Sequence, residues 1–181
     1  MLTIHGQGSQ GLVVFDALKA SNPSAEVKWT DAKNGSLPKP TDYFICAIGD
    51  NRTRLDMGGT LTVIHPAARI SDTAEIGQGV FVGAFAFIGP KAKIGDYAII
   101  NNGAIIEHEC EVGRAAHVAS GAVLSGRVVV GEGVLVGAGA TVRIGQKIGA
   151  WAVVGAGAVV VDDIPDGQTW VGNPARQLVR D

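Results

Sequence analysis

His108 is the side chain in this sequence that is best suited to move a proton. It interrupts a stretch rich in glycine and alanine and stands between Glu107 and Glu109. An imidazole accepts a proton near neutral pH, and a neighbouring carboxylate can hold it in one tautomer and raise its basicity. The group therefore suits a general base that deprotonates an attacking amine or hydroxyl. The alternative is a surface histidine between two solvated glutamates, which does no chemistry.

A second group of residues is typical of a phosphate site. The segment GQGSQG at residues 6–11 follows a plausible strand at residues 2–5 and precedes an amphipathic helix at residues 12–20. In a strand–turn–helix unit, such a turn brings backbone N–H groups and a helix N-terminus to a phosphate. The candidate ligand-binding residues of this turn are Gly8, Ser9 and Gln10.

Two further strands, expected at residues 25–30 and 43–48, complete a βαβ unit. Asp31 directly follows the first of them and suits a contact to a ribose, and Gly49 directly follows the second. About sixty residues make half of a dinucleotide fold. We therefore expect residues 1–60 to be a half-Rossmann-like domain that binds a mononucleotide or a nucleotide sugar rather than NAD. The alternative is a βα capping element whose glycines only permit close packing.

An aliphatic residue recurs at every sixth position through the rest of the chain. Neither the period of a helix nor the alternation of a strand produces this spacing. Three hexapeptides folded into a triangular coil do produce it, with the aliphatic side chain inward and glycine in the turn. We expect a parallel β-helix at residues 61–181 rather than a β-sandwich, whose loops would vary in length. The positions are Ile64, Ile70, Ile76, Val82, Ile88, Ile94, Ile100, Ile106, Val112, Val118, Leu124, Val130, Val136, Val142, Ile148, Val154 and Val160.

The composition narrows the class of partner. Of 181 residues, 46% are hydrophobic, and the formal net charge of −2 comes from interspersed acidic and basic residues. We therefore expect no basic face for nucleic acid or for an anionic membrane. No apolar run has membrane-spanning length and the first residues lack a signal-peptide pattern, so we expect a cytoplasmic location. Cys46 and Cys110 stand alone and are interpreted as reduced packing residues.

Three stretches resemble a known group of enzymes. They are CAIGDN at residues 46–51, INNGAIIEHEC at residues 100–110 and VGNPAR at residues 171–176. They resemble the hexapeptide-repeat sugar acetyltransferases of the sialic acid O-acetyltransferase type, and most closely the UDP-4-amino-sugar N-acetyltransferases of the bacillosamine pathway. The resemblance implies a left-handed β-helix and a homotrimer with active sites between neighbouring subunits. It implies N-acetylation of a nucleotide-linked, UDP-type 4-amino-4,6-dideoxy sugar by acetyl-CoA. We expect direct attack in a ternary complex, because Cys110 takes an inward repeat position and no other nucleophile is well placed. We expect no metal, because a zinc site needs three histidines and His65 lies two to three coils away.

The resemblance also implies roles for residues of the repeat. His108 is the general base and Glu109 its partner. Asn101 lies beside the sugar or base, although it equally fits a turn residue that replaces glycine. Gly126 offers a backbone N–H to the thioester oxygen. The residues implied at the acetyl-CoA end and in the pantetheine groove are His117, Ala138 and Ala156.

Spacing and departures from the family add three expectations. His117 follows His108 by nine residues, half of an eighteen-residue coil, so the two should face different walls of one subunit. Gln10 stands where the bacillosamine-pathway enzymes carry histidine. A short helix at residues 52–60 replaces the long helix that usually follows the third strand. Both departures leave the identity of the nucleotide open. Arg176 and Arg180 would either bind the phosphates of CoA or form a solvated basic tail. The alternative functions are sugar O-acetylation and a non-catalytic trimeric binding module.

Overall fold

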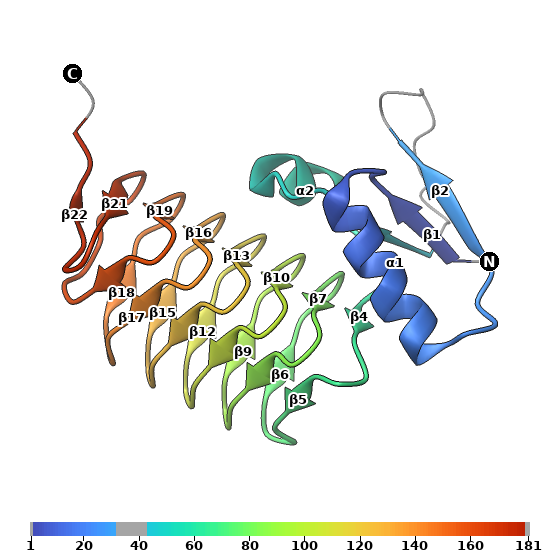
Figure 1. Cartoon of the computed structure of the whole chain (residues 1–181), viewed down its shortest axis with the longest axis horizontal. Coiled ribbons are helices and arrows are strands. Elements are labelled where there is room, and N and C mark those ends of the chain that lie inside the picture. Colours follow the sequence, from blue (N-terminus) through green and yellow to red (C-terminus); the bar gives the residue numbers. More distant parts are fainter. Residues whose placement is uncertain (1, 32–42, 180–181) are drawn as a thin grey trace.

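A short parallel sheet and one helix form the first part of the chain. The computed structural model describes residues 2–31 and 43–179. Figure 1 shows this first part packed beside one end of a long coil of short strands. The strands pair in the order β2-β1-β3, all parallel, so β1 lies in the centre. The elements are β1 (Leu2–His5), α1 (Ser9–Ser21), β2 (Val27–Thr30) and β3 (Phe44–Cys46).

Helix α1 packs an apolar face onto this sheet. Val14, Ala17 and Leu18 are buried and share a hydrophobic cluster with Ile4 of β1 and Ile45 of β3. Burying a Val, Leu or Ile side chain stabilises a fold by about 1.5–3 kcal/mol. This apolar face, more than helix propensity, therefore holds α1 on the sheet, and the expected small α/β unit is confirmed.

The boundaries of these elements differ from those expected. α1 begins at Ser9 instead of residue 12, inside the glycine-rich turn. It can do so because Gly11 lies against the carbonyl oxygen of Gly6, where a Cβ would not fit. Strands β2 and β3 are shorter than residues 25–30 and 43–48, because the chain leaves the sheet soon after pairing with β1.

A short second helix, α2 (Asn51–Met57), connects β3 to the coil of short strands. Its N-terminus is capped by Asp50, whose carboxylate accepts a hydrogen bond of 2.8 Å from the Thr53 amide. The helix ends at Met57 rather than at residue 60, because Gly58 takes a positive φ of 65°. No helix in residues 2–31 and 43–179 is long and apolar enough to cross a membrane.

From Val63 onward the chain winds into a left-handed parallel β-helix of hexapeptide repeats. Through β20, strand residues pair with those eighteen positions later, as Ile99 does with His117, so three hexapeptides make one coil. In the last coil the spacing is sixteen, as between Val153 and Thr169. The first wall holds β4 (Val63–Ile64), β7 (Phe81–Val82), β10 (Ile99–Ile100), β13 (His117–Val118), β16 (Leu135–Val136), β19 (Val153–Val154), β21 (Thr169–Val171) and the antiparallel β22 (Arg176–Gln177). The second wall holds β5 (Arg69–Ile70), β8 (Phe87–Ile88), β11 (Ile105–Ile106), β14 (Val123–Leu124), β17 (Thr141–Val142) and β20 (Val159–Val160). The third wall holds β6 (Glu75–Ile76), β9 (Lys93–Ile94), β12 (Glu111–Val112), β15 (Val129–Val130) and β18 (Lys147–Ile148).

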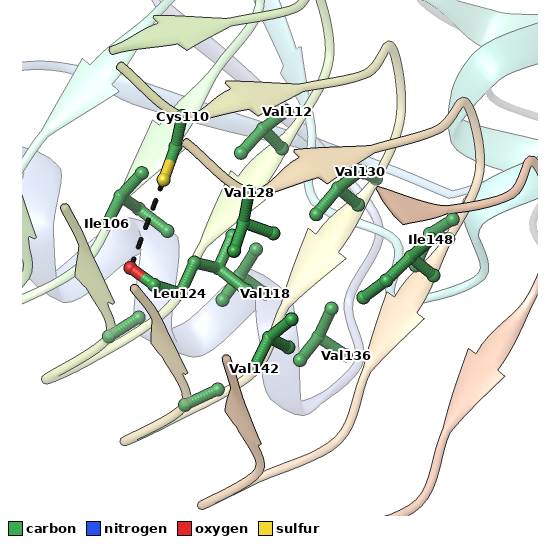
Figure 2. Packing of buried hydrophobic residues seen from close by; sticks show 14 of the residues in the cluster. Ile106, Cys110, Val112, Val118, Leu124, Val128, Val130, Val136, Val142 and Ile148 are labelled. Atoms are coloured by element: carbon green, nitrogen blue, oxygen red, sulfur yellow. Dashed lines mark hydrogen bonds between the residues drawn. The ribbon is translucent and has the colours of Figure 1, made fainter. Parts of the chain in front are cut away.

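The inward positions of the repeat form one continuous core. Val118, Leu124 and Val136 are fully buried, and Figure 2 shows such side chains stacked from coil to coil. Cys110 is also fully buried among them and is not bonded to another cysteine, as expected of a packing residue. Burial falls at the open N-terminal end, where Ile64 is 38% exposed. The period of six is thus confirmed as one side of a coil, and three such sides complete the coil that stacks on the next.

The outer faces of the three walls differ in chemistry. The third wall exposes charged side chains, such as Lys93 and Glu111. On the first wall, Phe81 and Ile99 are buried in the cluster that α1 and the small sheet also build, so the α/β unit covers this end of the wall. The second wall carries half-buried apolar side chains on its outer face. These are Phe87, Ile105, Val123 and Val159.

Candidate active site

A cleft of about 410 Å³ lies at the carboxyl ends of the three parallel strands. It is lined by the turn after β1, by Asp31 after β2 and by residues 47–49 after β3. In open parallel sheets, ligands bind at this edge, where connections leave the central strand in opposite directions. The cleft brings together five of the six residues that are predicted to bind the nucleotide sugar; the sixth, Asn101, is not in its lining. The five are Gly8, Ser9, Gln10, Asp31 and Gly49.

The three glycines of the turn have different geometric roles. Gly6 has a φ of 110°, and a Cβ there would press on the carbonyl of Ala47. Gly11 lies against the carbonyl of Gly6. A Cβ at Gly8, in contrast, would meet nothing within 4 Å, although Gly8 lines the cleft. Close packing therefore accounts for Gly6 and Gly11 but not for Gly8, which leaves space for a ligand.

Helix α1 points its N-terminus into the same cleft. Its N-cap, Gly8, has no side chain to accept a hydrogen bond from the first turn, and that turn contains no acidic residue. Unpaired N–H groups and the positive end of the helix dipole favour an anion at such a position. Gln10 lines the cleft, and its Nε2 is buried without a hydrogen-bond partner among the described residues. The geometry therefore suits a phosphate group.

The β-helix contributes His117 to this cleft, from strand β13 of the first wall. Its Nε2 lies 3.3 Å from Nδ2 of Asn101. Because Oδ1 of Asn101 accepts a hydrogen bond of 2.8 Å from the Asn102 amide, its NH₂ group faces the imidazole. Nε2 of His117 is then the acceptor. Burial, aided by the positive charge of Arg54, lowers the pKa of His117 to about 4, so the ring is neutral at pH 7.

His108 and Glu109 form the turn between β11 and β12, at the corner where the second wall meets the third. Nδ1 of His108 lies 3.1 Å from Oε2 of Glu109, and the two side chains are 44% and 48% exposed. Glu109 has a positive φ of 58°, as do residues at the equivalent turns above and below it. The other ring nitrogen lies beside Gly126 of the next coil, where any Cβ would collide with Nε2. His108, Glu109 and Gly126 thus meet at one corner.

The predicted site residues therefore fall into three places. His117 lines the cleft and Asn101 contacts its ring, whereas His108, Glu109 and Gly126 lie at the one corner that does not border the first wall. The two histidines face different walls, as their spacing predicts. Ala138 and Ala156 stack at the corner between the first and second walls, where the Gly157 amide bonds to the Ala138 carbonyl at 2.9 Å. The sequence did not reveal that His117 reaches the cleft beside the small sheet.

Two described arginines, Arg54 and Arg176, differ in burial. Arg54 of α2, which sequence reasoning missed, is buried between the cleft and the β-helix. Its only signal is its place in a short helix directly after the cleft segment. Arg176 is exposed and lies 3.7 Å from Asp162, while Arg180 lies outside the described residues. Within the described ranges, no group of three or more His, Cys, Asp or Glu side chains could hold a metal ion.

Known proteins resemble this chain in both sequence and fold. The family model named bacterial transferase hexapeptide, which spans six repeats, matches residues 73–108 and 91–126. PerB from Caulobacter crescentus, solved with CoA and GDP-perosamine, is 37% identical with a TM-score of 0.89, over 98% of this chain and 97% of its own. The acetyltransferase domain of PglB from Neisseria gonorrhoeae is 33% identical with a TM-score of 0.90, over 98% of each chain. No curated protein matches the chain.

A third structure, WeeI from Acinetobacter baumannii, shares the fold at 24% identity and a TM-score of 0.89, over 98% of this chain and 99% of its own. The PglB domain has also been solved with acetyl coenzyme A, and the Caulobacter protein is described as a perosamine N-acetyltransferase. Likeness at this level over nearly the whole of both chains covers the cleft as well as the β-helix. The chain therefore belongs to the hexapeptide-repeat sugar N-acetyltransferases, a family of acetyl-CoA-dependent acyltransferases.

Proposed function

We propose that this enzyme acetylates the amino group of a 4-amino-4,6-dideoxy sugar linked to a nucleoside diphosphate, in the cytoplasm, with acetyl-CoA as the donor. Residues 1–60 bind the nucleotide sugar and residues 61–181 form the acyltransferase domain. The observation that carries the proposal is the cleft at the N-terminus of α1, which a β-helix histidine, His117, also lines. The likeness to PerB, which was solved with CoA and GDP-perosamine, supports the same pair of ligands.

The nucleotide part of the acceptor fits the α/β unit. The diphosphate lies at the N-terminus of α1, where the backbone amides after Gly8 and the Nε2 of Gln10 donate hydrogen bonds. The carboxylate of Asp31 accepts from a ribose hydroxyl, as acidic residues after the second strand do in related folds. The sugar then extends toward His117 and Asn101, whose side chains are joined at 3.3 Å.

The chemistry requires one proton to leave the attacking nitrogen. The amine attacks the thioester carbonyl carbon, a C–N bond forms, the C–S bond breaks and CoA leaves. Nε2 of His108 takes the proton from the nitrogen, since Nδ1–H donates to Glu109 at 3.1 Å, and the imidazolium then gives it to the departing sulfur. Glu109 stabilises the imidazolium, and the backbone N–H of Gly126 supports the charge on the thioester oxygen. No acyl-enzyme forms, because Cys110 is fully buried in the core.

A complete site needs a neighbouring subunit. The cleft adjoins the first wall, whereas His108 lies at the opposite corner of the same β-helix. A homotrimer brings the His108 corner of one subunit to the cleft of the next, with the pantetheine arm of acetyl-CoA along Ala138 and Ala156. The wall chemistry supports this arrangement, because four of the six outward strand residues of the second wall are apolar, whereas four of the five on the third wall are charged. An apolar outer wall gains free energy when a second subunit covers it.

The test is thiol release from acetyl-CoA with a panel of acceptors. We expect activity with GDP-perosamine or a UDP-linked 4-amino-4,6-dideoxy sugar, with the product carrying an amide-linked acetyl group by mass spectrometry. The matched 4-hydroxy sugars should be inactive, because a hydroxyl is the weaker nucleophile. Acetylation of the hydroxyl sugars, including sialic acid, in place of the amino sugars would show an O-acetyltransferase. Release of no thiol with any GDP-, UDP-, dTDP- or CMP-linked amino sugar would overturn the proposal.

A further inference from the structure

Arg54 is buried against the β-helix although it carries a charge. It is 1% exposed and is the largest of the fully buried side chains in the described part of the chain. Burial lowers its pKa to about 10, so the guanidinium remains charged at neutral pH. The guanidinium donates its hydrogen bonds to neutral oxygen atoms: Nε donates to the carbonyl of Tyr97 at 2.7 Å, and Nη1 donates to the carbonyl of Ile48 at 2.9 Å. Nη2 donates to Ala115 O at 2.6 Å.

These contacts join the two sides of the cleft. Ile48 lies in its lining, on the segment that follows β3. Ala115 stands two residues before His117, which lines the cleft from the first wall. One planar group therefore connects the segment contributed by the small sheet to the coil that carries the cleft histidine.

The same side chain also connects successive coils. Tyr97 and Ala115 are eighteen residues apart and occupy equivalent corner turns, with φ values of 61° and 52°. Nη2 of Arg54 also donates to Oδ1 of Asn51 at 2.9 Å. Nδ2 of Asn51 in turn donates to the carbonyl of Gly133, in the next equivalent turn, at 3.0 Å. Arg54 and Asn51 thus fasten α2 to three stacked turns.

From these contacts we infer that Arg54 is a positioning residue for the sugar nucleotide. It fixes the Ile48 edge of the cleft relative to His117, so that a bound ligand meets both at once. The inference rests on the proposed function of the cleft. The planar fork of an arginine donates in several fixed directions, whereas a lysine ammonium at the same place can satisfy fewer of these carbonyls. Charge alone is therefore insufficient, and geometry is the property that matters.

The test compares Arg54→Lys and Arg54→Met with Arg52→Met. Arg52 lies two residues earlier on α2 and stacks over Trp151, with 4.3 Å from its guanidinium carbon to the ring centroid, so it controls for loss of a cation that holds the helix. We expect Arg54→Lys to weaken sugar-nucleotide binding about tenfold to a hundredfold, as loss of alignment does, with CoA binding nearly unchanged. Arg52→Met should bind both ligands as the wild type does.

The titration of His117, followed by NMR, gives a second readout. Arg54→Met removes the charge that lowers the pKa of His117 and should raise that pKa, whereas Arg54→Lys keeps a charge there and should raise it less. A folded Arg54→Lys enzyme that binds the sugar nucleotide with wild-type affinity would overturn the inference. If neither Arg54 variant folds, Arg54→Gln, a neutral side chain with a single amide group in place of the guanidinium, takes their place: wild-type binding by it also overturns the inference. A wild-type enzyme that binds no sugar nucleotide, or binds it unaffected by Gly8→Val, would instead overturn the proposed function of the cleft and the inference with it.

Discussion

His108 can be tested for proton transfer without disturbing the fold, because its ring projects from a corner turn and is 44% exposed. If it takes the proton from the attacking amine, His108→Ala should lower kcat by about a hundredfold to ten-thousandfold, the range of general-base contributions. KM for both substrates should change little, since the loss occurs in the transition state. Steady-state thiol release checks this, with the melting temperature as the control. A variant with near-normal kcat would show that His108 is a surface residue with no role in proton transfer.

The burial of His117 predicts how the free energy of unfolding depends on pH. Its pKa is about 4 in the folded chain and near 6.5 when exposed, so the unfolded state binds the extra proton between these values. Stability from this group is therefore fully present above pH 6.5 and is lost as the pH falls toward 4, by about 3 kcal/mol in total. Urea unfolding at pH 7 and pH 5 measures the loss. His117→Gln should lose less stability than the wild type over this interval, and equal losses would contradict the burial of the ring.

At the residue scale, what the sequence could predict depended on whether a residue breaks a pattern. His108 and Asn101 stand out because they interrupt a regular repeat, and the structure places each at a turn or wall where its side chain faces outward. Arg54 breaks no pattern, because one arginine in a short helix is ordinary. Its burial depends on carbonyls of Tyr97 and Ala115, more than forty positions along the chain. Such contacts arise from the docking of α2 on the β-helix and leave no local trace.

The glycine-rich turn is an element in which ligand binding and packing can be separated by substitution. Gly8→Val should leave the melting temperature nearly unchanged, because a Cβ at this position meets nothing within 4 Å, yet it should raise the KM for the sugar nucleotide by filling the phosphate site. Gly11→Ala should instead lower the melting temperature, because its Cβ would collide with the Gly6 carbonyl. Calorimetry and steady-state kinetics on both variants check this. Equal effects of the two variants on stability would contradict a ligand role for Gly8.

At the element scale, period and order could be read from the sequence, while boundaries and docking could not. A six-residue period has one structural solution, so the coils and their inward Ile, Val and Leu side chains were predictable. The start of α1 was not, because it depends on the contact between Gly11 and Gly6. The packing of the α/β unit against the first wall was not predictable either. Phe81 and Ile99 follow the repeat like their neighbours, and only the folded chain shows them packed against the α/β unit.

For the whole molecule, the separation of His108 from the cleft determines how many chains make a site. The first wall carries the cleft with His117, and the His108 corner lies between the other two walls. If His108 acts on a ligand held in the cleft, as proposed, a single chain carries both parts of the site but cannot bring them together without a second copy. In a closed ring of three, every subunit lends its His108 corner to one neighbour and receives a corner from the other. Light scattering should give the mass of a trimer.

Mixing two inactive variants tests this sharing directly. His108→Ala subunits keep an intact cleft, and Gly8→Val subunits keep His108. Each homotrimer should therefore be nearly inactive when the sugar nucleotide is kept far below the raised KM of the Gly8→Val variant. If the variants are unfolded and refolded together in equal amounts, a site is intact when a cleft from the first meets a base from the second. Random assembly makes about a quarter of all sites intact, since each half is supplied correctly with a chance of about one half. Activity should rise to about a quarter of the wild-type value, while a mixture refolded separately stays inactive. No recovery in mixed trimers would mean that cleft and base act within one chain, against the separation of the two corners.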